Sequence, residues 1–116
     1  MTDPNCLFCR IAAGTIPATI VHRDERMVAF KDISPQAPVH LVLVPLEHFA
    51  GLNDLDPERA GLLGHLALVA RDLAKAHGVD RSGWRLLANC GPDAGQTVFH
   101  LHLHLLGGAP MSGRLV

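Results

Sequence analysis

An alternation of histidine and apolar residues near the end of the chain constrains its fold more than any other feature. In "TVFHLHLHLLGG", which runs from Thr97 to Gly108, three histidines stand two residues apart. Successive side chains of a β-strand point to opposite faces, so the pattern predicts a strand over Val98–Leu106. One face of that strand would carry Phe99, Leu101, Leu103 and Leu105 as core. The other would carry His100, His102 and His104, with about 7 Å from one imidazole to the next.

The rest of the chain predicts an α+β fold. Asp56 is a suitable N-cap, Pro57 suits the first helical position and Gly78 suits the end of a long helix between them. An apolar stripe of Leu62, Leu66, Val69 and Leu73 supports that helix. The other expected elements are a short helix over Cys6–Ala13, a hairpin of Thr19–Glu25 and Met27–Ile33, and strands over His40–Pro45 and Trp84–Asn89. Such an order is typical of one domain, residues 1–116, built on a mostly antiparallel sheet.

Composition excludes several classes of function. The formal net charge is −1 and no basic stripe is present, which argues against nucleic acid as a partner. No apolar run reaches the roughly 20 residues of a membrane span, and the N-terminus does not resemble a signal peptide. Three cysteines favour thiols or a metal site over a disulfide framework. We therefore expect a soluble, cytoplasmic protein without a membrane partner.

A glycine-rich loop leads directly into the histidine-bearing segment. Gly91 and Gly95 can turn backbone amides toward an anion, and Gln96 and Thr97 close the loop. Thr97 adds a hydroxyl at the entrance to the predicted strand. Backbone donors and a hydroxyl beside imidazoles favour a receptor for a phosphoryl group.

Three imidazoles in one row suit chemistry at phosphorus. Neutral imidazole already has a free lone pair and attacks without a general base. Because its ordinary pKa lies near 6.5, one histidine can stay neutral while a protonated neighbour serves the leaving group. His102, which is flanked on both sides, is the best candidate for the nucleophile.

A metal site is the competing interpretation of the same residues. Three histidines can hold a catalytic zinc ion, and Cys6-x-x-Cys9 needs two further ligands, which His48 and one of the triad could supply. A set of two cysteines and two histidines would make a closed, structural site. His100 could serve there and leave His102 and His104 free.

His22, His65 and His77 lie outside both groups and are expected to have structural or surface roles, and Cys90 is expected to be a small buried residue.

The segment His100–Leu106 resembles the signature of the histidine triad (HIT) family, in which three histidines alternate with apolar residues. "CLFCRIAAGTIPA", "FKDISPQAPVHLVLVP" and "AGQTVFHLHLHLLGG" are similar, in that order, to the nucleotide-binding Hint branch. The resemblance implies a HIT-like fold with a five-stranded antiparallel sheet, one main helix and a short N-terminal helix, usually as a homodimer. It also implies attack at the α-phosphate of a nucleoside phosphate derivative through a nucleotidyl-histidine intermediate.

The same resemblance assigns roles to individual residues. His102 would be the nucleophile and His40 would support its orientation, while His104 and Thr97 contact the phosphate beside His100. The nucleotide site would comprise Phe30, Asp32, Ile33, Asn89, Gly95, Gln96 and Thr97. Cys6, Cys9, His48 and His100 match the zinc ligands of some relatives, where zinc would be structural and not required for the chemistry.

The expected activity is that of a purine nucleoside phosphoramidase, which cleaves a P–N bond and releases an AMP-like nucleotide. The alternatives are a dinucleoside polyphosphate or adenylyl-sulfate hydrolase of the same family, and a zinc-stabilised nucleotide-binding regulatory module with little catalysis. After Gly108 the chain departs from eukaryotic relatives: it has Ala109 where they have arginine, and its tail has no tryptophan. The resemblance therefore does not define the leaving group.

Overall fold

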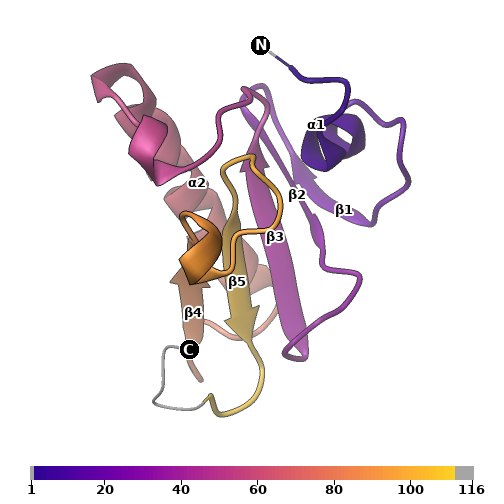
Figure 1. Cartoon of the computed structure of the whole chain (residues 1–116). Helices are drawn as coiled ribbons and strands as arrows, with labels where there is room; N and C mark the ends of the chain where they lie inside the picture. Colours follow the sequence, from indigo (N-terminus) through magenta and orange to yellow (C-terminus); the bar gives the residue numbers. More distant parts are fainter. Residues whose placement is uncertain (1, 112–116) are drawn as a thin grey trace.

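A five-stranded antiparallel sheet forms the centre of the protein in a computed structural model, which describes residues 2–111 (Figure 1). The strand order is β1-β2-β3-β5-β4. The strands are β1 (Ile20–Arg23), β2 (Met27–Lys31), β3 (Val39–Pro45), β4 (Trp84–Leu87) and β5 (Leu103–Gly107). Two α-helices, α1 (Leu7–Ala12) and α2 (Pro57–Ala76), and two short 3-10 turns, Leu52–Asp54 and Pro92–Ala94, complete the described fold. This arrangement confirms the expected α+β architecture.

The two helices cover opposite faces of the sheet (Figure 1). Leu41 and Leu43 of β3 pack in the same core as α2, whereas Val42 and Val44 pack in the same core as α1. Because both faces are covered, β3 is an almost continuous apolar run rather than an alternating one. His104 of β5 pairs with Val42, so this histidine belongs to the face that α1 covers.

The long helix begins and ends where local chemistry predicts. The carboxylate of Asp56 accepts a hydrogen bond from the Arg59 amide at 2.9 Å, and Pro57 occupies the first helical position. Gly78, directly after the C-cap, has a φ of +75°, a conformation that other residues rarely adopt. All four residues of the predicted apolar stripe, Leu62, Leu66, Val69 and Leu73, are buried in the core.

The last strand is shorter than predicted, and this difference matters for the site. β5 begins at Leu103, so Val98–His102 precedes the ladder instead of extending it. In this segment the Leu101 amide donates to the Phe49 carbonyl at 2.8 Å, which directs the backbone toward residues 49–50 rather than toward β3. Phe99 was expected in the core but is 53% exposed, because it lies in this diverted segment.

Two histidines outside the triad join the β1–β2 turn to the long helix. His22 and His65 contact the same Asp24 carboxylate oxygen at 2.7 and 2.8 Å. Burial alone would raise the pKa of Asp24, but hydrogen bonds from His22, the Arg26 amide and His65 outweigh it and hold that pKa well below its usual range. The expected structural role of His22 and His65 agrees with these contacts.

Among residues 2–111, no helix has both the length and the apolarity that crossing a membrane requires.

Candidate functional site

A rigid loop precedes the histidine-bearing segment. Gly91 and Gly95 have φ values of +89° and +87°, in the region that favours glycine. The buried Gln96 side chain holds the loop: its carbonyl accepts from the Gly91 amide at 2.8 Å, and its nitrogen donates to the carbonyls of Ala50 and Val98 at 2.6 and 3.1 Å. Gln96 therefore shapes the loop from inside. Thr97 lies beside it with an exposed side chain.

The hydrogen bond of His102 fixes which of its nitrogens is reactive. Its Nδ1 lies 2.7 Å from the backbone carbonyl oxygen of His100. A carbonyl can only accept, so Nδ1 carries the proton and Nε2 keeps a free lone pair. Burial lowers the pKa of His102, which favours this neutral form. The ring of Phe8 packs edge-on against the imidazole, with 4.8 Å between ring centroids.

A chain of hydrogen bonds likewise fixes the tautomers of His40 and His104. The Gln36 amide donates to His40 Nδ1 at 3.0 Å, so neutral His40 carries its proton on Nε2. That proton points to His104 Nδ1, 2.9 Å away, with an Asp32 carboxylate oxygen at 3.4 Å from the same nitrogen. His104 therefore carries its own proton on Nε2.

Burial keeps both of these histidines neutral. It lowers the pKa of His104 to about 4, and the repulsion between a protonated His104 and protonated His102 or His40 would lower that pKa further. Burial also lowers the pKa of His40, against the opposing effect of Asp32. The result is a neutral N–H donor beside the lone pair of His102. Asp32, His40 and His104 also lie close enough together to share a metal ion, but the hydrogen-bond chain from Gln36 already accounts for their arrangement.

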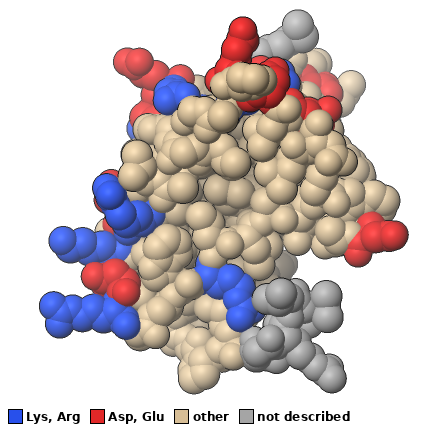
Figure 2. All heavy atoms as spheres, turned by 90° about the vertical axis from the view of Figure 1, so that its left-hand side faces the viewer, with Lys and Arg blue, Asp and Glu red and all other residues tan. Residues whose placement is uncertain are grey.

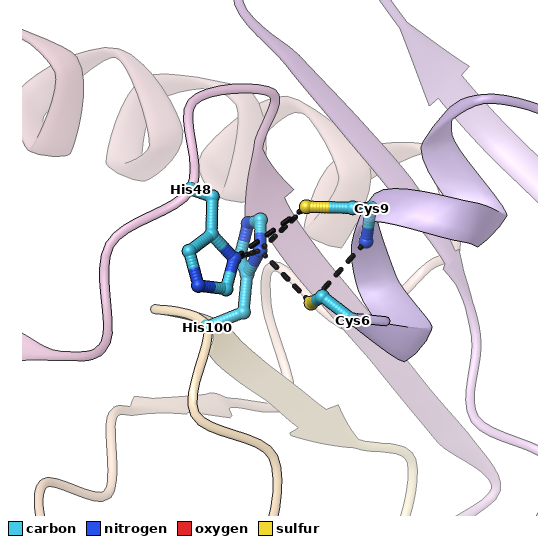
Figure 3. A group of neighbouring side chains, drawn as sticks. All are labelled: Cys6, Cys9, His48 and His100. Atoms are coloured by element: carbon cyan, nitrogen blue, oxygen red, sulfur yellow. Dashed lines mark hydrogen bonds between the residues drawn. The ribbon is translucent and has the colours of Figure 1, made fainter. Parts of the chain in front are cut away.

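A second cluster joins three distant segments of the chain at the start of α1 (Figure 3). His100 Nδ1 lies 3.4 Å from Cys6 Sγ, 3.5 Å from Cys9 Sγ and 3.0 Å from His48 Nδ1. Cys9 Sγ and His48 Nδ1 are 3.5 Å apart. Four ligands around a tetrahedral zinc ion would stand roughly 3.3–3.8 Å from one another. The three distances that involve sulfur fall in this range, and the two imidazole nitrogens need to separate by only a few tenths of an ångström. The four side chains therefore fit a closed zinc site of two cysteines and two histidines.

The surroundings of the cluster also suit a metal. His100 is fully buried and its Nε2 donates to the Pro45 carbonyl at 2.8 Å, which leaves Nδ1 as a free ligand. Burial, with the charges of His48 and His102, lowers the pKa of His100 to about 4 and keeps it neutral. Burial raises the pKa of the Cys9 thiol, whereas a bound dication would favour its thiolate.

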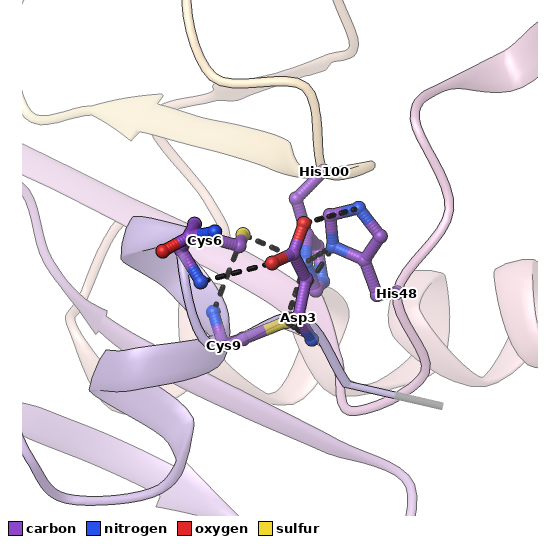
Figure 4. Close-up of polar contacts among 6 residues, drawn as sticks. Asp3, Cys6, Cys9, His48 and His100 are labelled. Carbon is purple, nitrogen blue, oxygen red and sulfur yellow. Dashed lines mark hydrogen bonds and ion pairs between the residues drawn. The ribbon is translucent and has the colours of Figure 1, made fainter.

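Asp3 lies beside the same cluster (Figure 4). One of its carboxylate oxygens is 4.0 Å from His48 Nε2, and its amide donates to Cys9 Sγ at 3.4 Å. Carboxylates beside the outer nitrogen of a ligand histidine orient its ring and increase its basicity. Asp3 is thus placed to support His48 as a ligand.

The remaining predicted residues lie in different surroundings. Phe30 is buried, with its ring centroid 5.6 Å from that of Phe8. Asp32 and Asn89 are half-buried, Gly95 is exposed, and Ile33 is 95% exposed. Sequence reasoning missed Phe8 and Gln36, which contact the histidines directly. Phe8 carried a usable signal, since it is the aromatic residue between Cys6 and Cys9, whereas Gln36 acts through a backbone amide and carries none.

The fold and the site together define a class of protein: a small α+β domain with an imidazole cluster behind a glycine-rich loop, beside a cysteine–histidine cluster that could hold a metal ion. Comparison with known proteins gives the family. A family model described as "Scavenger mRNA decapping enzyme C-term binding" matches residues 5–114. Protein HitA of Neisseria gonorrhoeae is 50% identical over 103 residues, covering 89% of this chain and 95% of HitA. The purine nucleoside phosphoramidase of Escherichia coli (strain K12) is 39% identical over 109 residues, covering 94% and 92%. The chain therefore belongs to the histidine triad family, in its Hint-like branch.

Solved structures agree with this assignment. A HIT family hydrolase from Clostridium thermocellum superposes with a TM-score of 0.96 at 44% identity, covering 99% of this chain and 100% of that one. A zinc-bound histidine triad family protein from Mycobacterium smegmatis superposes with a TM-score of 0.80 at 31% identity, covering 95% of this chain and 81% of that one.

The cluster predicts that the purified protein carries about one zinc ion per chain, since its four ligands complete a tetrahedral site. Cys9→Ser should lose most of this zinc and lower the melting temperature, because bound metal stabilises the folded state. Elemental analysis and thermal unfolding measure both effects. Cys90→Ser is the matched control, because Cys90 lies outside the cluster, and it should retain zinc. Equal zinc in wild type and Cys9→Ser would contradict this assignment.

Proposed function

We propose that this chain is a hydrolase that cleaves purine nucleoside 5′-phosphoramidates at the α-phosphorus through a nucleotidyl-His102 intermediate. The observation that carries the proposal is the 2.7 Å hydrogen bond from His102 Nδ1 to the His100 carbonyl, which leaves Nε2 as a neutral nucleophile. The 39% identity to the purine nucleoside phosphoramidase of Escherichia coli supports the substrate class.

In the first step, the Nε2 lone pair of His102 attacks the α-phosphorus as the P–N bond breaks. The leaving nitrogen takes a proton from solvent and departs as a neutral amine. The adduct places a positive charge on the imidazole, and the His100 carbonyl stabilises that charge through Nδ1–H. His100 itself has no proton to give, since its Nε2–H is held by Pro45.

The neighbouring donors act on the phosphoryl oxygens. His104 presents Nε2–H, because its Nδ1 accepts from His40. The amides of Ala94, Gly95 and Gln96, which the glycine-rich sequence suggested as donors, already donate to backbone carbonyls within the loop. The exposed Thr97 hydroxyl supplies a further donor from the loop. Such fixed donors stabilise the charge that develops in the transition state. In the second step, water attacks phosphorus, its proton passes to solvent, and His102 is released with formation of the nucleoside monophosphate.

The nucleoside would lie between the end of β2 and the glycine-rich loop. The Asp32 carboxylate can accept from ribose hydroxyls, and the exposed Ile33 offers apolar surface to the base. Phe30, which is buried in β2, and Asn89, which directly precedes the loop, complete the proposed nucleotide site. Gln96 contributes by holding the loop in shape.

Zinc at Cys6, Cys9, His48 and His100 is proposed as a structural ion. When bound, it ties α1 to the segment that precedes β5. The ion makes and breaks no bond in the reaction, because His102, His104 and His40 lie outside its ligand set.

The fold also supports a homodimer through α2 and β4. β4 is an edge strand, and an apolar groove lined by Leu63, Ala67 and Leu86 runs between it and α2. On the face that includes α2, most charged side chains lie toward the margins (Figure 2). Leu68, 52% exposed on α2, adds to this apolar surface. A second copy that pairs its own edge strand here would cover both features.

Light scattering of the purified chain should therefore give the mass of a dimer. Leu68→Arg should weaken the dimer at least about tenfold, because it places an unpaired charge in an apolar contact. Leu7→Arg changes a leucine of α1 that is 43% exposed, and this control should remain dimeric. A monomeric wild-type protein at micromolar concentration would refute the dimer.

Wild-type protein should hydrolyse adenosine 5′-phosphoramidate, and His102→Ala should lower kcat/KM by about 10⁴-fold or more through loss of the nucleophile. His77→Ala, at the end of α2, is the control and should keep full activity. Parallel assays with a dinucleoside polyphosphate and adenylyl sulfate compare the alternative substrates. Tight AMP binding without turnover of any of the three would refute the proposed activity and favour a nucleotide-binding module.

A further inference from the structure

The nucleophile lies in a segment that the sheet does not hold. β5 begins at Leu103, so His102 precedes the ladder with β3. Its ring lies edge-on to that of His104 in β5, with 5.0 Å between centroids, and two further contacts come from outside the sheet. Nδ1 donates to the His100 carbonyl at 2.7 Å, and Phe8 packs edge-on at 4.8 Å between ring centroids.

The Phe8 and His100 contacts both come from segments that contribute ligands to the cysteine–histidine cluster. The carbonyl belongs to His100, whose side chain is a member of the cluster. Phe8 lies between Cys6 and Cys9 in α1, a helix of six residues. A helix that short is not stable by itself and depends on its tertiary contacts. Phe8 packs against Phe30 in the core beneath α1, and Cys6 and Cys9 join the start of the same helix to the cluster.

The Pro45 carbonyl holds the His100 ring at 2.8 Å, but without a metal the contacts among the four side chains themselves are weak. His48 Nδ1 and His100 Nδ1 share one hydrogen bond of 3.0 Å, and the thiols of Cys6 and Cys9 make longer, weaker contacts of 3.4–3.5 Å. Four coordinate bonds would replace this set and fix both the His100 backbone and α1.

We propose that metal bound at Cys6, Cys9, His48 and His100 positions the nucleophile, so that metal occupancy controls the reactivity of His102 and not only the stability of the fold. His100 is then a positioning residue: its ring binds the metal and its carbonyl fixes the tautomer of His102. The inference rests on the proposed function for the role of His102 as nucleophile, but the geometric coupling can be measured without any substrate.

The direct test is ¹⁵N–¹H spectroscopy of imidazole nitrogens in zinc-loaded and chelator-treated wild-type protein, under conditions where circular dichroism shows both to be folded. The zinc-loaded protein should show one His102 tautomer, with the proton on Nδ1 and slow exchange. The metal-free protein should show a mixture of tautomers with rapid exchange. His102→Gln identifies the signal by its loss.

Activity provides a second measurement on the same samples. Metal removal should slow formation of nucleotidyl-His102 about tenfold or more, in the range found when outer-shell partners of a site are lost. Binding of AMP should change far less, since its contacts lie at Asp32 and the loop. Cys9→Ser should behave like the stripped protein, and Cys90→Ser like the loaded wild type.

An unchanged His102 tautomer and an unchanged rate after metal loss would overturn the proposal. If the tautomer responds to metal but no substrate is turned over, the positioning role stands and the proposed hydrolase activity fails. If removal of the metal unfolds the wild-type chain, the His48→Gln variant can be used instead, because it retains three of the four ligands. Its His102 spectra are then compared at partial and at full zinc occupancy. Equal spectra in those two states would likewise overturn it.

Discussion

The hydrogen bond between His102 Nδ1 and the His100 carbonyl is the interaction on which the rest of the site depends. At 2.7 Å it selects one tautomer of a buried, neutral imidazole. The free Nε2 that results can attack phosphorus without a general base. The surrounding residues keep this arrangement in place: Phe8 packs on the His102 ring, and the Pro45 carbonyl accepts a hydrogen bond from the His100 side chain.

Carbonyl and amide groups of the backbone determine the tautomers of His40, His100 and His102 directly, and that of His104 through His40. The carbonyls of Pro45 and His100 accept from His100 and His102, and the Gln36 amide donates to His40. These contacts leave a lone pair on His100 Nδ1 directed at the cysteine–histidine cluster, a lone pair on His102 Nε2 and an N–H on His104 Nε2. Four imidazoles that are chemically alike thereby acquire different tasks. Backbone groups suit this purpose because their donor or acceptor character does not change with pH.

Much of this arrangement could be predicted from residue patterns. The alternation of residues 101–105 indicated which side chains enter the core, and Leu101, Leu103 and Leu105 are all buried. The apolar run of β3 and the stripe on α2 were also informative, because both arise from burial on a regular element. The start of β5 was not predictable, since the Leu101–Phe49 and Gln96–Ala50 contacts that divert the chain join residues distant in sequence. For the same reason Phe99 was wrongly placed in the core.

The central claim is that His102 becomes covalently nucleotidylated. Rapid quenching of wild-type protein with adenosine 5′-phosphoramidate, followed by peptide mass spectrometry, tests it most directly. The account predicts one adenylyl group on the peptide that contains His102, formed and lost at rates compatible with turnover, and absent from His102→Ala. Turnover with no adduct, or an adduct on another residue, would contradict the account.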